Sequence, residues 1–191
     1  MKITRREILG LLTARLDEPR LRHSLATEKE AIRLAARYRE NWQKAALAAL
    51  LHDLCKCDPI EWQLRYLRGC PVKLPQEWLQ NPQLLHGPCA AEYIRRELKI
   101  TDREILGAVR WHTTGHQGMT SLEKIVFLAD KIEATRDYEG VEESRAAACQ
   151  NLDKAVRLEL RNKLSKVCKM GLPLVKEAWE AYNEMTMPID S

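Results

Sequence analysis

The chain has 191 residues, a length typical of a single domain with a sizeable hydrophobic core. Its 45% hydrophobic and 30% charged residues exclude an intrinsically disordered or fibrous protein. The net charge of +4 arises from 31 Lys and Arg residues against 27 Asp and Glu residues, and it is spread along the chain. We therefore do not expect nucleic acid as a partner.

The apolar segments of the sequence are short. The longest run, Ala45 to Leu51, is far shorter than a bilayer span. The stretch from Ile8 to Leu12 is too short for a signal peptide and is not followed by a small-residue cleavage site. We therefore expect a cytoplasmic protein without membrane contact, in which the six cysteines are free thiols. Cys55 and Cys57 lack the partners of a usual structural zinc site.

Helical periodicity runs through nearly the whole chain. Apolar residues recur every fourth position from Ile8 to Leu16, directly after a Thr-x-x-Glu capping box at Thr4 to Glu7. The same capping box at Thr101 to Glu104 and at Thr120 to Glu123 predicts two further helix starts. A single Phe and the absence of Asn-Gly or Asp-Gly turns between alternating segments leave little from which to build strands. The predicted fold class is all-α.

Glycine and proline residues punctuate helices rather than separate domains. The segment from Pro59 to Pro82 is less regular, and we expect a packed connector, with a helical insertion over one end of the bundle as the alternative. Two amphipathic helices, Leu152 to Val167 and Leu174 to Met185, are predicted to close the bundle. We therefore predict one domain over residues 1–191, with residues 152–191 as closing helices that carry no visible chemistry.

Four of the polar residues stand where apolar helices are predicted. His52 and Asp53 follow directly on the longest apolar run, Asp130 follows a second apolar run, and His23 lies on the preceding helix. Each histidine by itself is more often a core or surface residue than a ligand. Together, however, buried imidazole and carboxylate groups need partners, and this mixture suits zinc, iron or manganese. The positions of these four residues along the chain predict that side chains from three helices close around one ion.

Two further histidines supply a second set of nitrogen donors. His86 begins a predicted helix with Pro88 in its first turn, and His112 ends the predicted helix from Ile105 to Trp111. If the carboxylate of Asp53 bridges two ions about 3.5–4 Å apart, each of its oxygens binds one of them. His86 and His112 then hold the second ion. The residues therefore predict a dinuclear metal centre.

The order of these residues resembles the HD-domain metal-dependent phosphohydrolases, which are all-helical bundles. Four longer stretches narrow the resemblance to the bacterial YqeK family, whose members are symmetrical diadenosine tetraphosphate hydrolases. These stretches are Ala49-Leu50-Leu51-His52-Asp53-Leu54-Cys55-Lys56, Leu85-His86-Gly87-Pro88, His112-Thr113-Thr114-Gly115 and Ala129-Asp130-Lys131-Ile132-Glu133-Ala134-Thr135-Arg136. The resemblance runs from about His23 to Leu152, with Ala49 in place of the usual Gly and Ala134 in place of the usual Pro.

The resemblance implies a ligand set, a metal and a reaction. The implied metal ligands are His23, His52, Asp53, His86, His112 and Asp130, all of which are present. The implied metal is iron, although these residue types also suit manganese or zinc. A water that bridges two ions loses its proton near neutral pH, and the hydroxide attacks phosphorus. Diadenosine tetraphosphate, a small-molecule dinucleoside polyphosphate, then gives two ADP without a nucleophilic side chain.

Two residues are assigned to catalysis, Asp53 as the bridging carboxylate and Lys56 as a cation beside the polyphosphate. Lys56 and Arg136 are both expected to bind substrate phosphates as cations, and the guanidinium of Arg136 can do so through two parallel hydrogen bonds. Solvated surface charge is the alternative for both.

The loop after His112 supplies the other expected substrate contacts. Thr113 and Gly115 are expected to present hydroxyl and backbone N–H groups to phosphate oxygens, with helix capping as an equal alternative. His116 stands four residues after His112 but lacks the Glu of a zinc protease motif. We expect it to line the substrate site or to lie on the surface.

Two other functions are compatible with the sequence. One is an HD-domain hydrolase of another nucleotide, such as a guanosine alarmone, a deoxynucleotide or a cyclic dinucleotide, although the Gly-Tyr-Pro signature of cyclic-dinucleotide hydrolases is absent. The other is a non-catalytic helical binding module. A complete ligand set favours an enzyme. A homodimer is compatible with the sequence.

Overall fold

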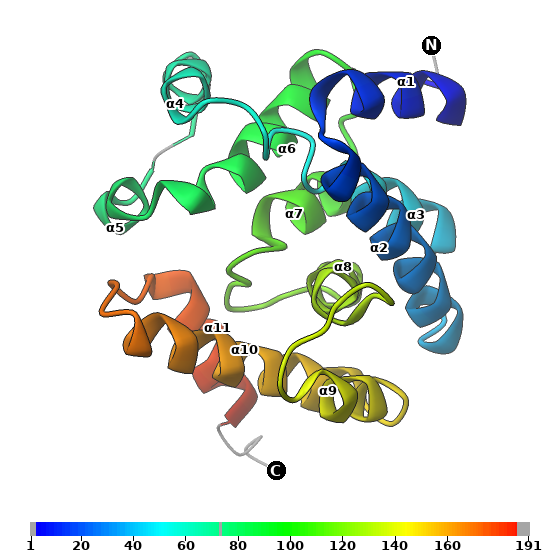
Figure 1. The fold of residues 1–191 in the computed structure, drawn as a ribbon, viewed down its shortest axis with the longest axis vertical. Coiled ribbons are helices and arrows are strands. Elements are labelled where there is room, and N and C mark those ends of the chain that lie inside the picture. Colours follow the sequence, from blue (N-terminus) through cyan, green and yellow to red (C-terminus); the bar gives the residue numbers. More distant parts are fainter. Residues whose placement is uncertain (1–2, 73, 187–191) are drawn as a thin grey trace.

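A computed structural model describes residues 3–72 and 74–186, and within these ranges every regular element is a helix. This confirms the all-α fold class. The elements, drawn in Figure 1, are α1 (Arg5–Arg15), α2 (Glu18–Arg37), α3 (Trp42–Leu51), α4 (Ile60–Arg68), α5 (Gln76–Gln80), the 3-10 helix η1 (Pro82–Leu84), α6 (His86–Arg96), α7 (Arg103–Trp111), α8 (Ser121–Ile132), α9 (Val141–Ala148), α10 (Leu152–Lys169) and α11 (Lys176–Thr186).

Two of the three predicted capping boxes are present. Thr4 begins α1 and Thr120 begins α8, each with the reciprocal Glu contact. The third prediction was wrong, because the N-cap of α7 is Asp102 rather than Thr101. The Asp102 carboxylate accepts hydrogen bonds from two backbone N–H groups of the first turn. Aspartate is the stronger of the two N-cap residues, so α7 begins one residue later than expected.

Helix α8 lies at the centre of the molecule. It packs against α2, α7 and α10, and in Figure 1 it is seen nearly end-on between them. Phe127, the only phenylalanine, and Leu128 are completely buried on it. Burying side chains of this size contributes roughly 1.5–3 kcal/mol each. The apolar run before Asp130 therefore anchors the helix that carries this carboxylate.

The segment predicted to be a packed connector contains α4, α5 and η1. Helix α4 packs on α6, and Trp62 stacks on Tyr66 with ring centroids 5.1 Å apart. Trp78 of α5 is buried in a small second core with Leu84 and residues of the α11 region, and its indole N–H donates to Glu177. The connector is therefore helical and packed. Lys73 lies outside the described residues.

Two C-terminal helices are present as predicted. They are α10 and α11, which pack against each other, and α10 also packs on α8 and α9. Residues 187–191 of the predicted closing segment lie outside the described residues. The assignment of the whole chain to one domain stays a prediction.

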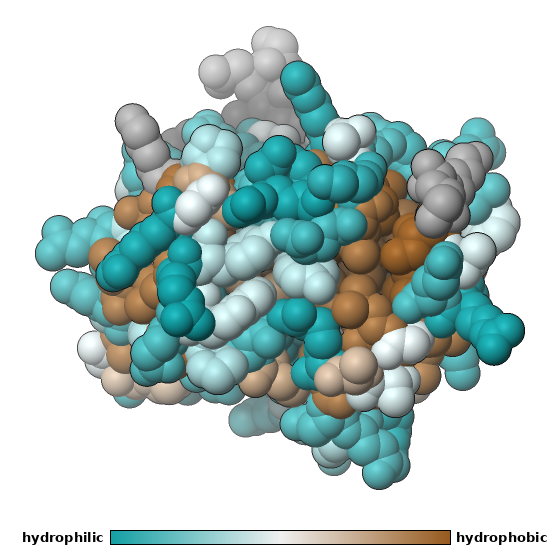
Figure 2. All heavy atoms as spheres, turned by 90° about the horizontal axis from the view of Figure 1, so that it is seen from above, coloured by the Kyte–Doolittle hydropathy of each residue, from teal (hydrophilic) through white to brown (hydrophobic). Residues whose placement is uncertain are grey.

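The face drawn in Figure 2 is mostly hydrophilic, with brown areas where apolar side chains reach the surface. Among the described helices, none combines the length and the apolar character needed to cross a bilayer. All six cysteines are free, which confirms the prediction of free thiols.

Helices α6 and α7 lie close together at Gly87. A Cβ atom at this position would lie 2.7 Å from the backbone carbonyl oxygen of Arg110, which is closer than real Cβ atoms come. The absence of a side chain therefore allows the first turn of α6 to lie against the last turn of α7. This contact brings His86 next to His112. It explains why a glycine follows the histidine in the Leu-His-Gly-Pro motif.

We expect the substitution Gly87→Ala to lower the melting temperature, because the added methyl group separates α6 from α7. Overpacking of this kind costs about 1–3 kcal/mol. The matched control is Gly10→Ala in α1, where an added Cβ meets nothing within 4 Å. There, the better helix propensity of alanine is expected to stabilise the protein by about 0.5–1 kcal/mol. Thermal unfolding that responds equally to both substitutions would contradict the close approach at Gly87.

Candidate metal centre

The structure brings all six predicted ligands into one buried cluster. They come from five parts of the fold: α2, the chain after α3, the start of α6, the end of α7 and the last turn of α8. No member of the cluster is more than 6% exposed. The six residues, called the metal cluster below, are His23, His52, Asp53, His86, His112 and Asp130.

One half of the metal cluster is built around His23 and His52. Their Nε2 atoms lie 3.2 Å apart, and His23 Nε2 lies 3.0 Å from Asp130 Oδ1. Oδ2 of Asp53 lies 3.5 Å from His52 Nε2 and 3.9 Å from His23 Nε2. The donor atoms of His23, His52 and Asp130 are close enough together to hold one ion.

The other half is built around His86 and His112. Their Nε2 atoms lie 3.0 Å apart. The second oxygen of Asp53, Oδ1, lies 3.2 Å from His86 Nε2 and 3.5 Å from His112 Nε2. The two oxygens of this carboxylate therefore face different pairs of histidines, which is the arrangement that a bridging carboxylate requires.

Each imidazole is held in place through its other nitrogen. The Nδ1 atoms of His52, His86 and His112 lie 2.6, 2.6 and 2.7 Å from the backbone carbonyl oxygen three residues earlier. Nδ1 of His23 lies 3.0 Å from Oε1 of the buried Glu133. Carbonyl and carboxylate oxygens only accept hydrogen bonds, so each Nδ1 carries the proton. The four Nε2 atoms consequently face the cluster.

This donor set fits transition-metal ions. The Nε2 atoms of each histidine pair lie 3.0 and 3.2 Å apart, close enough for one cation to contact both. Four imidazole nitrogens with carboxylate oxygens form a mixture that suits iron, manganese or zinc. Metal-binding histidines also commonly donate their second N–H to a carbonyl or carboxylate, as these four do.

The ionisation states of the cluster also suit a metal. Burial lowers the pKa of His52, and it lowers the pKa of His112 to about 3, so both imidazoles are neutral. Burial by itself raises the pKa of Asp53, but its contacts with the surrounding histidines hold this pKa well below the usual range. For Asp130, the neighbouring Lys131 ammonium is the main group that outweighs burial and lowers the pKa. Neutral imidazole and ionised carboxylate are the forms that bind metals.

Cationic side chains surround the metal cluster. Of the predicted ones, Arg136 lies 2.6 Å from Asp130 Oδ1, and Lys56 Nζ lies 3.3 Å from His86 Nδ1. Three further cations were not predicted from the sequence. Arg20 places its guanidinium 2.9 Å from Asp53 Oδ2, and Lys131 pairs with Asp130. The third is Lys163, whose charge acts on Asp130. We call these five residues the cation ring: Arg20, Lys56, Lys131, Arg136 and Lys163.

Lys163 reaches the cation ring from α10. Lys163 lies on the same face of this helix as Val156 and Leu160, which precede it by seven and three residues. Both of these side chains are buried against the rest of the fold. Burial, followed by the charges of Lys131 and then Lys56, lowers the pKa of Lys163 to about 7, while Asp130 acts in the opposite direction. A lysine on an apolar stripe was the sequence signal available for this residue.

The residues of the loop after α7 contact different parts of the molecule, and only some of them face the metal cluster. The Thr113 hydroxyl lies 2.9 Å from His112 Nε2 and 3.2 Å from His86 Nε2, so it faces the metal cluster. Gly115 has φ +64°, and its N–H donates to the carbonyl of Trp111, which is the helix-capping alternative. His116 Nε2 lies 3.2 Å from the carboxylate of Glu123. Substrate contacts by Gly115 and His116 stay predictions.

Comparison with known proteins agrees with this arrangement. Residues 20–135, more than half of the chain, match the HD domain family. The fold and the His-Asp cluster thus define an HD-domain protein, and the chain belongs to that family, which confirms the predicted HD-domain helical bundle.

Near full-length relatives narrow the family further. The chain is 36% identical over 187 residues to the symmetrical bis(5'-nucleosyl)-tetraphosphatase of Halalkalibacterium halodurans, covering 97% of this chain and 98% of the relative. It is 35% identical over 182 residues to the Bacillus subtilis protein of the same name, covering 95% and 97%. Within the HD-domain proteins, the chain belongs to the symmetrical bis(5'-nucleosyl)-tetraphosphatase family, also called YqeK.

A solved structure supports the fold over almost the whole chain. It is the crystal structure of an HD superfamily hydrolase from Clostridium acetobutylicum, described as involved in NAD metabolism. The TM-score is 0.94 at 34% sequence identity, and the match covers 97% of this chain and 98% of the other.

We expect Glu133→Gln to weaken metal binding by about 10–100-fold, because the neutral amide no longer holds the imidazole of His23 as a carboxylate does. The Glu133 carboxylate also accepts hydrogen bonds from the hydroxyl and the backbone N–H of Thr135, so its position is fixed. Metal titration under competition with a chelator measures the effect. The control is Glu139→Gln on an exposed side chain, and equal affinities in the two variants would contradict the role given to Glu133.

Proposed function

We propose that this protein is a metal-dependent hydrolase that cleaves diadenosine tetraphosphate symmetrically into two ADP. The observation that carries the proposal is the convergence of four imidazole Nε2 atoms on two carboxylates in a buried cluster ringed by cations. Similarity to symmetrical tetraphosphatases over nearly the whole chain supports the choice of substrate.

We propose that the cluster holds two transition-metal ions, of which iron is the expected identity and manganese or zinc the alternatives. One ion would be held by His23, His52 and Asp130 and the other by His86 and His112, with Asp53 between the two sets. When bound, such ions activate the attacking water and offset the charge of the phosphate oxygens.

The cation ring divides into two groups by its ion pairs. Arg20 pairs with Asp53, while Lys131 and Arg136 pair with Asp130, so we assign these three cations to holding the carboxylates in place. The expected contact of Arg136 with substrate phosphate stays a prediction. Lys56 and Lys163 have no carboxylate partner among the described residues. We assign these two lysines to the oxygens of the substrate polyphosphate, where charge-assisted hydrogen bonds are strong.

The Thr113 hydroxyl is placed to take part in the same contacts. It lies between two imidazole nitrogens and both donates and accepts hydrogen bonds, so it orients a water or a phosphate oxygen at this edge of the cluster. The leaving group of symmetrical cleavage is a nucleoside diphosphate. Because a diphosphate leaves readily, we assign no general acid.

A cavity of about 280 Å³ opens beside the metal cluster and gives the substrate a place to extend. Lys56 and His86 form the side of this cavity toward the cluster, and Ile60, Gln63 and Pro82 form much of the rest. The one lining carboxylate, Asp58, is paired with Arg15. We propose that one end of the dinucleotide lies here, since the cavity also offers a cation and an apolar and amide lining.

We propose a cytoplasmic location, which the free cysteines support because cytoplasmic proteins keep their thiols reduced. A homodimer stays a prediction.

Product analysis tests the reaction. We expect the metal-loaded protein to convert diadenosine tetraphosphate into ADP alone and, in ¹⁸O-labelled water, to place the label in one of the two ADP molecules. Asp53→Asn is expected to abolish turnover while keeping its helical circular dichroism, and Asp137→Asn on an exposed side chain is the control. A dominant pair of AMP and ATP would overturn symmetrical cleavage. Hydrolysis of other nucleotides only would favour a different substrate.

Lys163 is tested by separating substrate binding from metal binding. We expect Lys163→Met to lower kcat/KM by at least tenfold, mainly through KM, because a hydrogen bond to a charged group contributes about 1.5–3 kcal/mol. Lys163→Arg is expected to retain most of the activity, and metal content is expected to stay unchanged in both variants. Lys166→Met, on an exposed side chain of the same helix, is the control. A kcat/KM in Lys163→Met equal to that of Lys166→Met would exclude the phosphate contact.

A further inference from the structure

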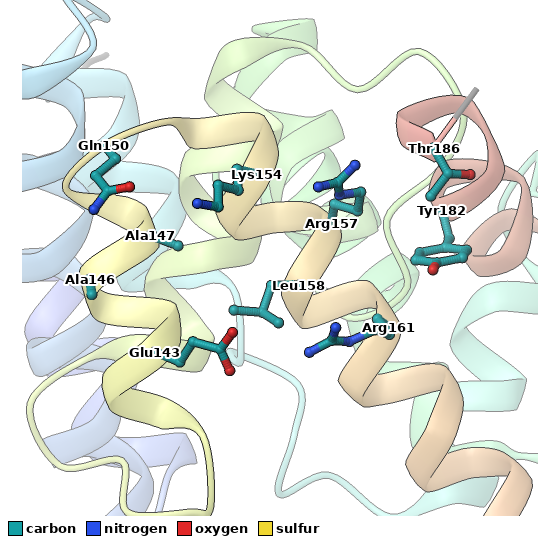
Figure 3. A pocket seen from close by; sticks show the side chains of 10 residues that line it. All are labelled: Glu143, Ala146, Ala147, Gln150, Lys154, Arg157, Leu158, Arg161, Tyr182 and Thr186. Carbon is teal, nitrogen blue, oxygen red and sulfur yellow. The ribbon is translucent and has the colours of Figure 1, made fainter. Parts of the chain in front are cut away.

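A second cavity lies between α9, α10 and α11, apart from the metal cluster. Its volume is about 370 Å³, and none of the six cluster residues lines it (Figure 3). Lys163 and Arg161 are two residues apart on α10, so their side chains point to roughly opposite sides of the helix. One side of α10 therefore faces the metal cluster, and the other side forms a wall of this second cavity.

Positive charge dominates the lining of the cavity. Three cations, Lys154, Arg157 and Arg161, come from one face of α10, whereas Glu143 of α9 is the single lining carboxylate. None of the three cations has an ion pair or a side-chain hydrogen bond within residues 3–72 and 74–186. Like charges spaced three or four residues apart on a helix repel each other. An anionic ligand would remove this repulsion.

The lining also provides a flat aromatic ring and an apolar floor. Tyr182 of α11 stands on the side opposite α9, and Leu158 and Ala147 lie between the charged groups, as Figure 3 shows. Leu158 and Ala147 are buried, while the cations are exposed at the rim. A volume of about 370 Å³ falls near the lower end of the range of small-molecule sites, roughly 300–1,000 Å³.

We propose that this cavity, called the α10 cavity, binds a nucleoside phosphate, with Arg157 and Arg161 on the phosphate groups and Tyr182 against the base. Guanidinium groups match phosphate oxygens through paired hydrogen bonds. Aromatic side chains stack on any base, because every base has a flat π face. The site is separate from the metal cluster, so the proposal does not depend on the hydrolase activity.

The test counts bound ADP by equilibrium dialysis of the metal-loaded protein with radiolabelled ADP. We expect the double variant Arg157→Ala/Arg161→Ala to bind one ADP fewer per chain than the unsubstituted protein, or to bind it at least tenfold more weakly. The matched control is Lys166→Ala/Lys169→Ala, which removes the same charge from exposed positions of α10 outside the cavity. Equal numbers and affinities in all three proteins would overturn the proposal.

A second measurement tests the contact with the base. Tyr182→Leu keeps an apolar side chain at this half-buried position but removes the ring. We expect it to weaken ADP binding at the α10 cavity while leaving the binding of inorganic tripolyphosphate unchanged. Equal effects on both ligands, or no effect on either, would overturn the nucleoside part of the assignment. Hydrolysis of diadenosine tetraphosphate by the double variant, measured separately, distinguishes a failure here from a failure of the metal centre.

Discussion

The structure depends on four imidazoles that direct their Nε2 atoms toward one place in the interior. Polar groups brought together away from water need partners, so the fold has to fix each ring in position. It does so by assigning an acceptor to every Nδ1–H and by ending two helices, α3 and α7, at the same point where α6 begins. The close packing at Gly87 serves the same requirement, since two of the imidazoles meet there.

Charge balance around the metal cluster gives the surrounding cations different roles. A buried carboxylate that keeps its charge needs a partner, and Asp53 and Asp130 have guanidinium or ammonium partners that hold them. Lysines without such a partner remain available to an incoming anion. The cations around the cluster therefore differ in whether they are paired in the folded state, and residue type does not reveal this difference. The same criterion singles out the unpaired arginines on the other side of α10.

The sequence predicts those parts of the protein whose signal is local. Capping boxes placed α1 and α8 correctly, and acids or histidines after apolar runs identified all six members of the metal cluster, because a buried ionisable group is costly without a partner. Asp102 was not predicted as the N-cap of α7, because Thr101 and Asp102 are adjacent and both residue types cap helices. Glu133, Arg20 and Lys163 were missed for another reason. Each acquires its role from a helix distant in sequence, as with the 110 residues that separate Glu133 from His23.

That difference in sequence separation also bears on how the protein folds. His86 and His112 are 26 residues apart on neighbouring helices, whereas the contact between His23 and Glu133 spans more than half of the chain. Closing a short loop costs less conformational entropy than closing a long one, so the α6–α7 pair is expected to assemble first during folding. The contact between His23 and Glu133 needs α2 and α8 to be in place, so the half of the cluster around His23 is expected to be completed last.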